Sequence, residues 1–523
     1  MNQRICSLAL ALQVIAMTCL CACQGPKDPL VVRTTSGLVK GCMEEEVFSF
    51  RAIPYMKADR FMPPQPADPW DTVRICDHYG PQSMQNVGNR EMGEDRMSEA
   101  NAFCMNIWST DLKAQKPVML WLHGGGFASG AGYASPQDTG AGFARKDVVL
   151  VSINHRLDIL GYLDLSACGE KYKYSGNVGM LDVVAALEWI RDNIAAFGGD
   201  PGNVTIFGES GGGGKVGTLL CMPPAQGLFH KAIIQSGTII NINSKEMSQK
   251  LGLAVLTELG LTPEQADRLA DVPYKELYRA GQQALAHSVG TRTPGTPMMW
   301  GFGPTPDGET LLQQPFSPGF ASISSDIPIL IGTTFNELQR SSYGQPLTAD
   351  EAKEILKGTF AEETDAYIEA FAQAYPDYTP QDLLSIDRMF RPKTVITADA
   401  ASAQKTAPVY TYMFTWRAPE GNAGSAHGYE LPFCFNTLPF ASRMLPNPTA
   451  EDLELADLMC GAWVNFATTG DPNTEGLPQW QPYTADNGEI MIFDLRREVR
   501  HNYDRTLQEI INRHCFPFPQ LAM

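Results

Sequence analysis

One serine in this chain, Ser210, has neighbours that suit nucleophilic chemistry. It stands in the pattern Gly208-x-Ser210-x-Gly212, which follows the apolar run from Val204 to Phe207 and precedes a run of small residues. We therefore predict a strand, a sharp turn and a helix in that order, an arrangement that lifts the serine hydroxyl out of the backbone. Because glycine is abundant in this chain, the five-residue pattern alone is weak, and other residues must support it.

Acyl transfer by a serine also needs N–H groups that bind the negative oxygen of the reaction intermediate. A glycine loop at residues 123–127 follows the predicted strand 117–122 and matches the HGGG type of oxyanion loop. Glycines let backbone amides approach the reacting oxygen closely. We therefore expect donors at Gly125 and Gly126, with Gly211 as a third; the alternative is a tight turn, which most glycine runs form.

A carboxylate and a histidine should follow two further strands and complete the set. Glu337 comes a few residues after the predicted strand 328–331, whereas Asp326 precedes that strand and would lie at the opposite edge. His427 follows the predicted strand 409–414 through a loop rich in glycine and alanine. Loop residues of both types are usually solvated surface, so only their places after the strands, in the order nucleophile, acid and base, select these two.

The other histidines suit the role of base less well. His123 belongs to the glycine loop, His78 and His155 precede the nucleophile, and His230 lies just before a strand. His427 alone gives the order serine, acid, histidine at the ends of strands.

Short apolar runs separated by helical stretches must position these residues. Such runs are typical of central strands that are covered by helices on both faces; they span residues 117–122, 148–153, 204–207, 232–235, 328–331 and 409–414. Residues 181–194 have helical spacing, and residues 30–55 predict a small antiparallel sheet. We therefore predict an α/β fold with a large, mostly parallel sheet, and function at the carboxyl ends of its strands. Residues 240–325 and 345–405 are expected to form helical excursions over that edge.

The charge and the composition exclude some kinds of partner. The chain has 523 residues, a formal net charge of −18 and a pI near 4.9, and no basic cluster. Phosphate binding needs clustered Lys and Arg, so we expect no nucleic-acid partner. No linker or repeat divides the chain after residue 30, and we predict a single domain over residues 27–517.

The N-terminus is typical of an exported protein. Arg4 and the apolar stretch 8–20 precede a small-residue exit that ends at Cys23. This resembles the lipobox of bacterial lipoproteins, so we predict a signal peptide over residues 1–22, a lipid on Cys23, and a location in the bacterial envelope, anchored to the outer membrane. The alternative is an ordinary signal peptide that happens to end in cysteine. Membrane contact is expected only through that lipid.

Other kinds of site find little support. Of the twelve cysteines, eight lie beyond Cys23, widely spaced and without a C-x-x-C pair, and H-E-x-x-H is absent. We expect no metal and no cofactor. A phosphate-binding P-loop that includes Gly211 to Lys215 would need glycine at 209 and Ser or Thr at 216, where this chain has Glu209 and Val216.

With these residues the chain resembles the type-B carboxylesterase/lipase family, the cholinesterase-like α/β-hydrolases, as a bacterial lipoprotein member. The matches cover nearly all of the chain beyond the signal segment; they lie at Ile53–Tyr55, Arg60-Phe61, Pro63-Pro64, Asn106–Trp108, the glycine loop, Asn154–Leu157, Gly161, Gly176-Asn177, Gly179–Asp182, Asn193–Pro201, Asn203-Val204, the serine turn, Gln235–Gly237, Asp307-Gly308, His427–Glu430, Trp463–Ala467 and Gly470–Asn473. The resemblance implies the α/β-hydrolase fold, a triad of Ser210, Glu337 and His427, and an oxyanion hole at Gly125, Gly126 and Gly211.

The resemblance also implies an activity, which is hydrolysis of small carboxylic esters through an acyl-enzyme on Ser210. The alternative is a catalytically weak or inactive adhesion protein, as some relatives are. Gly211 departs from the family, which usually has Ala there, and Ser83 and Ala102 stand where relatives carry a first disulfide. The segment 84–101 has no aromatic residue to hold a quaternary ammonium, so choline esters are not expected as substrates.

Overall fold

The fold is described from a computed structural model. It describes residues 28–86, 96–133, 140–240, 242–288, 301–317, 319–339, 347–404, 406–418 and 424–515. The predicted signal segment 1–22 and Cys23 lie outside the described residues.

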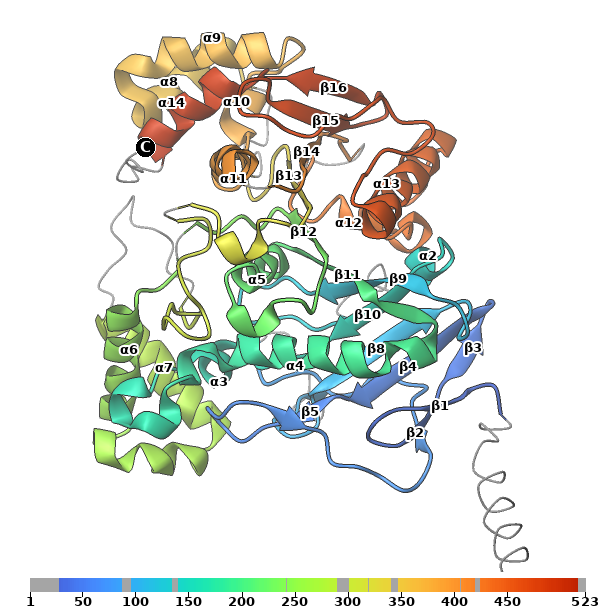
Figure 1. The fold of residues 1–523 in the computed structure, drawn as a ribbon. Coiled ribbons are helices and arrows are strands. Elements are labelled where there is room, and N and C mark those ends of the chain that lie inside the picture. Colours follow the sequence, from blue (N-terminus) through green and yellow to red (C-terminus); the bar gives the residue numbers. More distant parts are fainter. Residues whose placement is uncertain are drawn as a thin grey trace, which may run out of the picture.

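One sheet of eleven strands runs through the molecule (Figure 1). In spatial order its strands are β16 (Glu498–His501), β15 (Glu489–Phe493), β14 (Val409–Phe414), β13 (Ile329–Thr334), β12 (Lys231–Gln235), β11 (Gly199–Glu209), β9 (Lys116–Leu122), β10 (Val149–Ile153), β8 (Cys104–Ser109), β4 (Val47–Pro54) and β3 (Cys42–Glu44). The seven strands from β15 to β10 pair in parallel, and antiparallel strands flank them at both edges. The predicted α/β class with a mostly parallel sheet is confirmed.

The N-terminal strands divide between two sheets. β1 (Val31–Arg33) pairs antiparallel with β2 (Leu38–Lys40) in a separate small sheet, which β7 (Arg74–Ile75) joins in parallel. The predicted small sheet is therefore present, but it is shorter than residues 30–55, because β3 and β4 extend the large sheet instead. A further pair, β5 (Met56–Lys57) and β6 (Gln65–Pro66), stands apart.

Helices cover both faces of the large sheet. They are α2 (Ala141–Ala144), α3 (Asp158–Tyr162), α4 (Val178–Asn193), α5 (Gly211–Leu219), α6 (Lys245–Glu258), α7 (Tyr274–Ser288), α8 (Ala349–Phe360), α9 (Thr364–Ala374), α10 (Asp382–Ser385), α11 (Arg391–Gln404), α12 (Leu431–Cys434), α13 (Ala450–Thr469) and α14 (Arg505–Cys515). No described helix is long and apolar enough to span a membrane.

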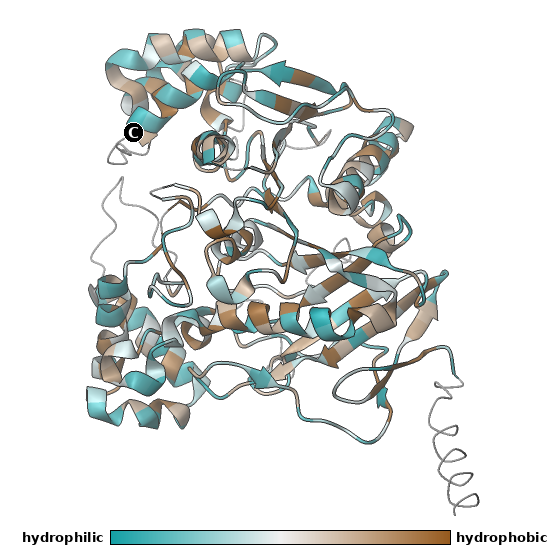
Figure 2. Cartoon of the chain, viewed as in Figure 1, coloured by the Kyte–Doolittle hydropathy of each residue, from teal (hydrophilic) through white to brown (hydrophobic). Residues whose placement is uncertain are grey.

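Alternate residues of the strands pack into separate cores. Along β9, Val118, Leu120 and Leu122 pack with α4 and α5, while Met119 and Trp121 pack on the other face with α12 and α13. A third core joins β15 to α8, α9 and α14. Figure 2 shows the matching pattern, with brown and teal residues alternating along the covering helices. The alternation of strand residues between the two cores fixes the register of each strand, and the register sets where the strand ends in the sheet.

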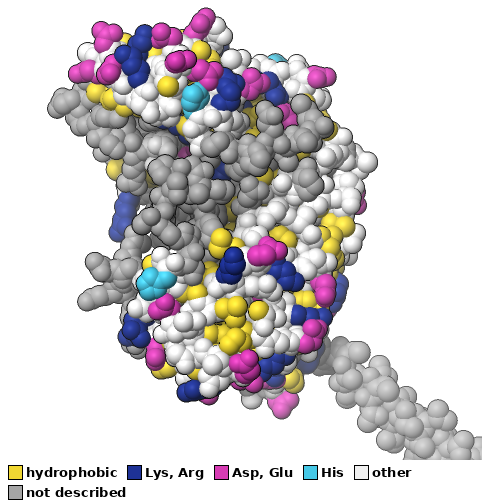
Figure 3. Space-filling model, turned by 90° about the vertical axis from the view of Figure 1, so that its left-hand side faces the viewer, with side chains coloured by type: hydrophobic (Ala, Val, Ile, Leu, Met, Phe, Trp, Pro, Cys, Tyr) yellow, Lys and Arg dark blue, Asp and Glu magenta, His cyan; other side chains and the backbone are white. Residues whose placement is uncertain are grey.

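The helical excursions lie on the side where α5 leaves β11 (Figure 1). They carry α6 and α7 in one segment and α8 to α11 in the other. On the face that they present, Figure 3 shows Lys and Arg side chains interspersed with Asp and Glu, so this face has mixed charge.

Candidate active site

Ser210 lies in the turn between β11 and α5. Its φ of 56° and ψ of −124° are strained for a residue with a side chain, and its N–H donates to the carbonyl of Gln235 at 2.9 Å. A Cβ at Gly208 would lie 2.5 Å from the carbonyl carbon of Gly212, and one at Gly212 would lie 2.0 Å from the carbonyl oxygen of Leu122. The two glycines of the motif thus permit a turn so tight that the serine side chain projects at the end of the strand.

Glu337 and His427 meet across the loops that follow β13 and β14. Nδ1 of His427 lies 2.5 Å from Oε2 of Glu337, and the backbone N–H of His427 donates to the carbonyl of Glu337 at 3.0 Å. Residues Glu337 and Ala426 also form an isolated parallel β-bridge. The two loops are therefore tied by their backbones as well as by the side chains.

Two further donors hold the carboxylate of Glu337. The hydroxyl of Ser236 donates to Oε1 of Glu337 at 2.6 Å, and the N–H of Thr334 donates to the same oxygen at 2.7 Å. Glu337 is 1% exposed. Its oxygens thus have fixed partners, which orient the one that faces the histidine.

The His427 ring is held on its flat side and at its second nitrogen. The ring of Phe390 stacks on it with centroids 5.2 Å apart, and Nε2 lies 3.1 Å from Oε1 of Glu209, the residue before Ser210. Nε2 therefore faces the end of β11, where the serine turn begins.

Carboxylates surround His427 and control its charge. Burial of the ring opposes the charged form, but Glu209, Glu337 and Glu430 together outweigh burial and raise the pKa of His427 to about 10. Burial, and then the charges of Glu209 and Glu337, raise the pKa of Glu430 well above its ordinary value, so this carboxyl favours its neutral form. The histidine is therefore a stronger base than a free imidazole.

The glycine loop lies beside the serine turn. A Cβ at Gly124 would lie 3.4 Å from Cβ of Ser210, and Gly125 and Gly126 have φ angles of 88° and 65°. Within the part of the chain that the structure describes, the N–H groups of Gly125, Gly126 and Gly211 have no hydrogen-bond acceptor. Three unpaired amides in one place are what an oxyanion hole requires.

The remaining buried histidines have other partners. His123 and His155 stack on each other with centroids 5.0 Å apart, and burial lowers the pKa of both, to about 3 for His123. A ring nitrogen of His230 accepts the N–H of Val204. None of these three reaches the carboxylate of Glu337 in the described structure.

Four residues of the site went unnoticed in the sequence. Glu209 lies in the serine turn, Ser236 in the segment Gln235–Gly237, and Glu430 three residues after His427. Their places beside motif residues were a signal. No sequence pattern, however, predicts that their carboxyl and hydroxyl groups surround one imidazole. Phe390 gave no signal at all, because it reaches the site from the segment before α11.

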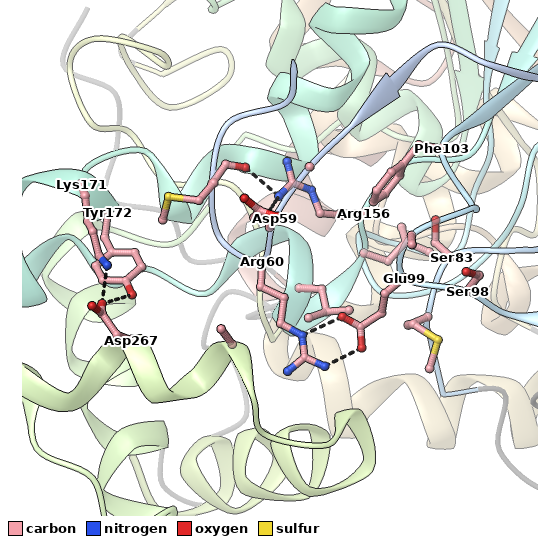
Figure 4. Close-up of a pocket in the computed structure, with 17 residues that line it drawn as sticks. Asp59, Arg60, Ser83, Ser98, Glu99, Phe103, Arg156, Lys171, Tyr172 and Asp267 are labelled. Carbon is pink, nitrogen blue, oxygen red and sulfur yellow. Dashed lines mark hydrogen bonds and ion pairs between the residues drawn. The ribbon is translucent and has the colours of Figure 1, made fainter. Parts of the chain in front are cut away.

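A cavity of about 520 Å³ lies apart from the triad (Figure 4). Four of the charged side chains in its wall form two ion pairs: Arg60 contacts Glu99, and Lys171 contacts Asp267. None of Ser210, Glu337 and His427 lines it. Nor does any group of three or more His, Cys, Asp or Glu residues within the described ranges form a metal site.

The comparisons with known proteins decide the family. The model of the family described as "Carboxylesterase family" matches residues 28–510. The chain belongs to this family. It is a carboxylic ester hydrolase with the α/β-hydrolase fold.

Relatives and solved structures resemble the chain over most of their length. It is 35% identical to a para-nitrobenzyl esterase of Bacillus subtilis, over 89% of this chain and 94% of the relative, and 33% identical to a fumonisin B1 esterase of Sphingopyxis macrogoltabida, over 89% and 87%. An esterase of Clostridium hathewayi that can hydrolyse aliphatic aromatic polyesters has a similar structure, with a TM-score of 0.83 and 37% identity over 94% of this chain and 99% of that one. These likenesses favour the carboxylesterase function, and none of them supports the alternative of an adhesion protein.

Proposed function

We propose that this carboxylesterase cleaves small carboxylic esters through an acyl-enzyme on Ser210. Oγ of Ser210 attacks the ester carbonyl while His427 takes its proton, and Glu337 holds the imidazole and stabilises its charged form. The N–H groups of Gly125, Gly126 and Gly211 bind the oxyanion. His427 then protonates the departing alcohol, and a water that His427 activates releases the acid.

The contact between Glu337 and His427 carries this proposal. The two residues are 90 positions apart in the sequence, yet Oε2 and Nδ1 lie 2.5 Å apart. A carboxylate at Nδ1 favours the neutral tautomer that carries its proton there, so that Nε2 is the nitrogen that accepts a proton. That second nitrogen faces the residue next to Ser210.

Hydrolysis of p-nitrophenyl acetate by Ser210→Ala tests the nucleophile. We expect kcat to fall by roughly a millionfold, the scale of nucleophile loss in serine hydrolases. Ser36→Ala, a change in the turn between β1 and β2, serves as the control and should leave kcat unchanged. Equal rates for Ser210→Ala and the wild type would overturn the proposal.

The substrate class is proposed from the names of the relatives. One acts on para-nitrobenzyl esters by name and another can hydrolyse aliphatic aromatic polyesters, so esters with an aromatic acid or alcohol are the first to test. A panel that varies acyl length and alcohol bulk separately, with kcat/KM as the readout, identifies the preferred ester. A higher kcat/KM for purely aliphatic esters across the panel would contradict the aromatic preference.

We also propose that the protein is exported, carries lipid on Cys23 and is anchored to the outer membrane, with residues 27–517 as one domain. The support is the sequence of residues 1–23 and the sharing of one sheet by strands from Cys42 to His501. Labelled palmitate should enter the wild type and Cys42→Ala but not Cys23→Ala. Label in Cys23→Ala would contradict lipidation at Cys23, and two separate unfolding transitions in calorimetry would contradict the single domain.

A further inference from the structure

Lys215 is a fully buried lysine one turn into α5, the helix that begins after Ser210. Its Nζ donates to the carbonyl of His123 at 2.9 Å and to the carbonyl of Gly126 at 2.9 Å. These carbonyls belong to the peptide groups at either end of the segment 124–126. The amides of Gly125 and Gly126, the expected oxyanion donors, lie between them.

The charge of Lys215 has no carboxylate to balance it. No ion pair involves its ammonium within the described ranges, and its other neighbour is the ring of Phe127, whose centroid is 5.6 Å away. Burial lowers the pKa of Lys215 to about 7. A buried ammonium without a carboxylate partner is costly, and the two carbonyls that accept from Nζ are the contacts that offset this cost.

Gly211 brings the same loop into contact with the start of α5. A Cβ at Gly211 would lie 2.1 Å from the carbonyl oxygen of Gly126, 2.3 Å from its Cα and 2.4 Å from its nitrogen. All three atoms are backbone, so no side-chain rotation could relieve the overlap. Any residue other than glycine at 211 must therefore push the glycine loop away from the helix.

The missing Cβ and the ammonium act on one oxygen. The carbonyl of Gly126 approaches Gly211 because nothing projects there, and at that place it accepts from Lys215. If Gly126 moved outward to clear a methyl group at 211, its bond to Lys215 would lengthen. Gly211, where the family usually has Ala, and the buried Lys215 thus both set the position of the Gly126 carbonyl.

We propose that Lys215 is a positioning residue of the oxyanion hole. It clamps both ends of the segment 124–126 so that the N–H groups of Gly125 and Gly126 stay aimed at the carbonyl that Ser210 attacks, and Gly211 makes this close packing possible. The inference rests on the proposed acyl-enzyme mechanism. Lys215 touches neither Ser210 nor the substrate in this scheme; it acts through the loop.

Lys215→Met tests the clamp, because methionine keeps an unbranched apolar chain and removes the ammonium. With p-nitrophenyl acetate we expect kcat to fall by about a hundredfold, as when one oxyanion donor is lost. KM should change by less than about threefold, because ground-state binding does not use the hole. Affinity for a phenylboronic acid, which forms a tetrahedral adduct on the serine, should fall in parallel with kcat.

Lys231→Met is the matched control. Lys231 is also a buried lysine, 8% exposed, but it lies at the start of β12 and donates to the side chain of Asn203. It should lose thermal stability without losing kcat or boronate affinity. Equal kcat losses in the two variants, or an unchanged kcat in Lys215→Met, would overturn the inference. Lys215→Gln keeps an uncharged donor and should give an intermediate kcat.

Gly211→Ala and the double variant Gly211→Ala/Lys215→Met complete the test. If Lys215→Met does not fold, Gly211→Ala still tests the inference by itself. Because both changes release the same carbonyl, the double variant should be about as slow as the slower single variant. Losses that multiply would show that the two residues act separately. An unaltered kcat and boronate affinity in Gly211→Ala would also overturn the inference.

Ser210→Ala separates this inference from the mechanism on which it rests. If Ser210→Ala is inactive while Lys215→Met has wild-type kcat, the acyl-enzyme mechanism survives and the clamp is wrong. If Ser210→Ala keeps full activity, the mechanism fails and the clamp fails with it.

Discussion

The two halves of the catalytic site are held in opposite ways. On one side, Glu337 and His427 are fixed by side chains that contact each other, with Ser236, Glu209 and Phe390 around them. On the other side, the glycine loop packs on α5 through backbone atoms with no side chain between them, and one buried lysine donates to two of its carbonyls.

This difference changes what a mutation does. In the proposed mechanism the side chains of Ser210, Glu337 and His427 carry the chemistry, so their removal should abolish proton transfer. Glycines of the loop carry only geometry, so their replacement shifts donors that are still present. Mutations in the first half should therefore cause large losses of kcat, and mutations in the second half smaller ones.

His427→Ala should give the largest loss. Without the imidazole no group takes the proton of Ser210, and kcat should fall by roughly a millionfold. His230→Ala is the control, since a ring nitrogen of His230 accepts the backbone N–H of Val204, away from Glu337 and Ser210. Pre-steady-state release of p-nitrophenol measures the effect, and a residual acylation rate within a hundredfold of the wild type would contradict the assignment of the base.

Glu337→Gln should cost less, about ten-thousandfold in kcat. The amide keeps the shape of the carboxyl group, but it can present N–H to Nδ1 and favour the wrong tautomer of His427. Asp326→Asn, before β13, is the matched control and should be silent. A loss below tenfold in Glu337→Gln would mean that another carboxylate orients the imidazole.

Strand patterns in the sequence place Ser210, Glu337 and His427 at one sheet edge more readily than they place the glycine loop against α5, for a physical reason. Ser210, Glu337 and His427 follow apolar runs that form β11, β13 and β14, and strand ends at one edge of a parallel sheet meet in space. Boundaries were good to a few residues; β11, for example, extends from Gly199 to Glu209 beyond the predicted 204–207.

The second half depends on how closely α5 approaches the backbone of the glycine loop, and no sequence pattern encodes that distance. The glycine run 211–214 was visible, but its overlap with Gly126 follows only from how closely α5 packs on the loop after β9. The sequence gives Lys215 no role beyond the P-loop comparison, because a lysine in a helix is normally exposed. β8 and the join of β3 and β4 to the large sheet were missed for a similar reason, since edge pairing depends on partners far away in the sequence.

Among the four consecutive glycines, position 211 should matter more than position 214. Gly211→Ala places a methyl group against the backbone of Gly126, and we expect kcat to fall by roughly ten- to a hundredfold as the donors shift. At Gly214→Ala the nearest atom, 2.4 Å away, is Cδ1 of Ile239, the mobile end of a side chain. This control should lose less than about threefold in kcat, and equal losses would show that helix strain, rather than the loop, limits the rate.

Glu209→Gln should have the smallest effect on the maximal rate and a clear effect on its pH dependence. His427 accepts a proton only when neutral, so activity falls as the pH drops below its pKa, which the carboxylates raise to about 10. Removal of the Glu209 charge lowers that pKa, so the acid limb of kcat/KM should move to lower pH and the rate near pH 7 should rise relative to the plateau.

Glu188→Gln, an exposed change on α4, is the control for this profile and should leave the acid limb in place. An acid limb in Glu209→Gln that coincides with the wild type would show that the charge of Glu209 does not raise the pKa of His427, which would leave that role to Glu337 and Glu430. A shift toward higher pH would contradict the sign, because loss of a negative neighbour can only make the imidazolium less favourable. Either result would leave Glu209 as a packing neighbour of His427, and the basicity of the imidazole would then depend on Glu430 and on the direct contact with Glu337.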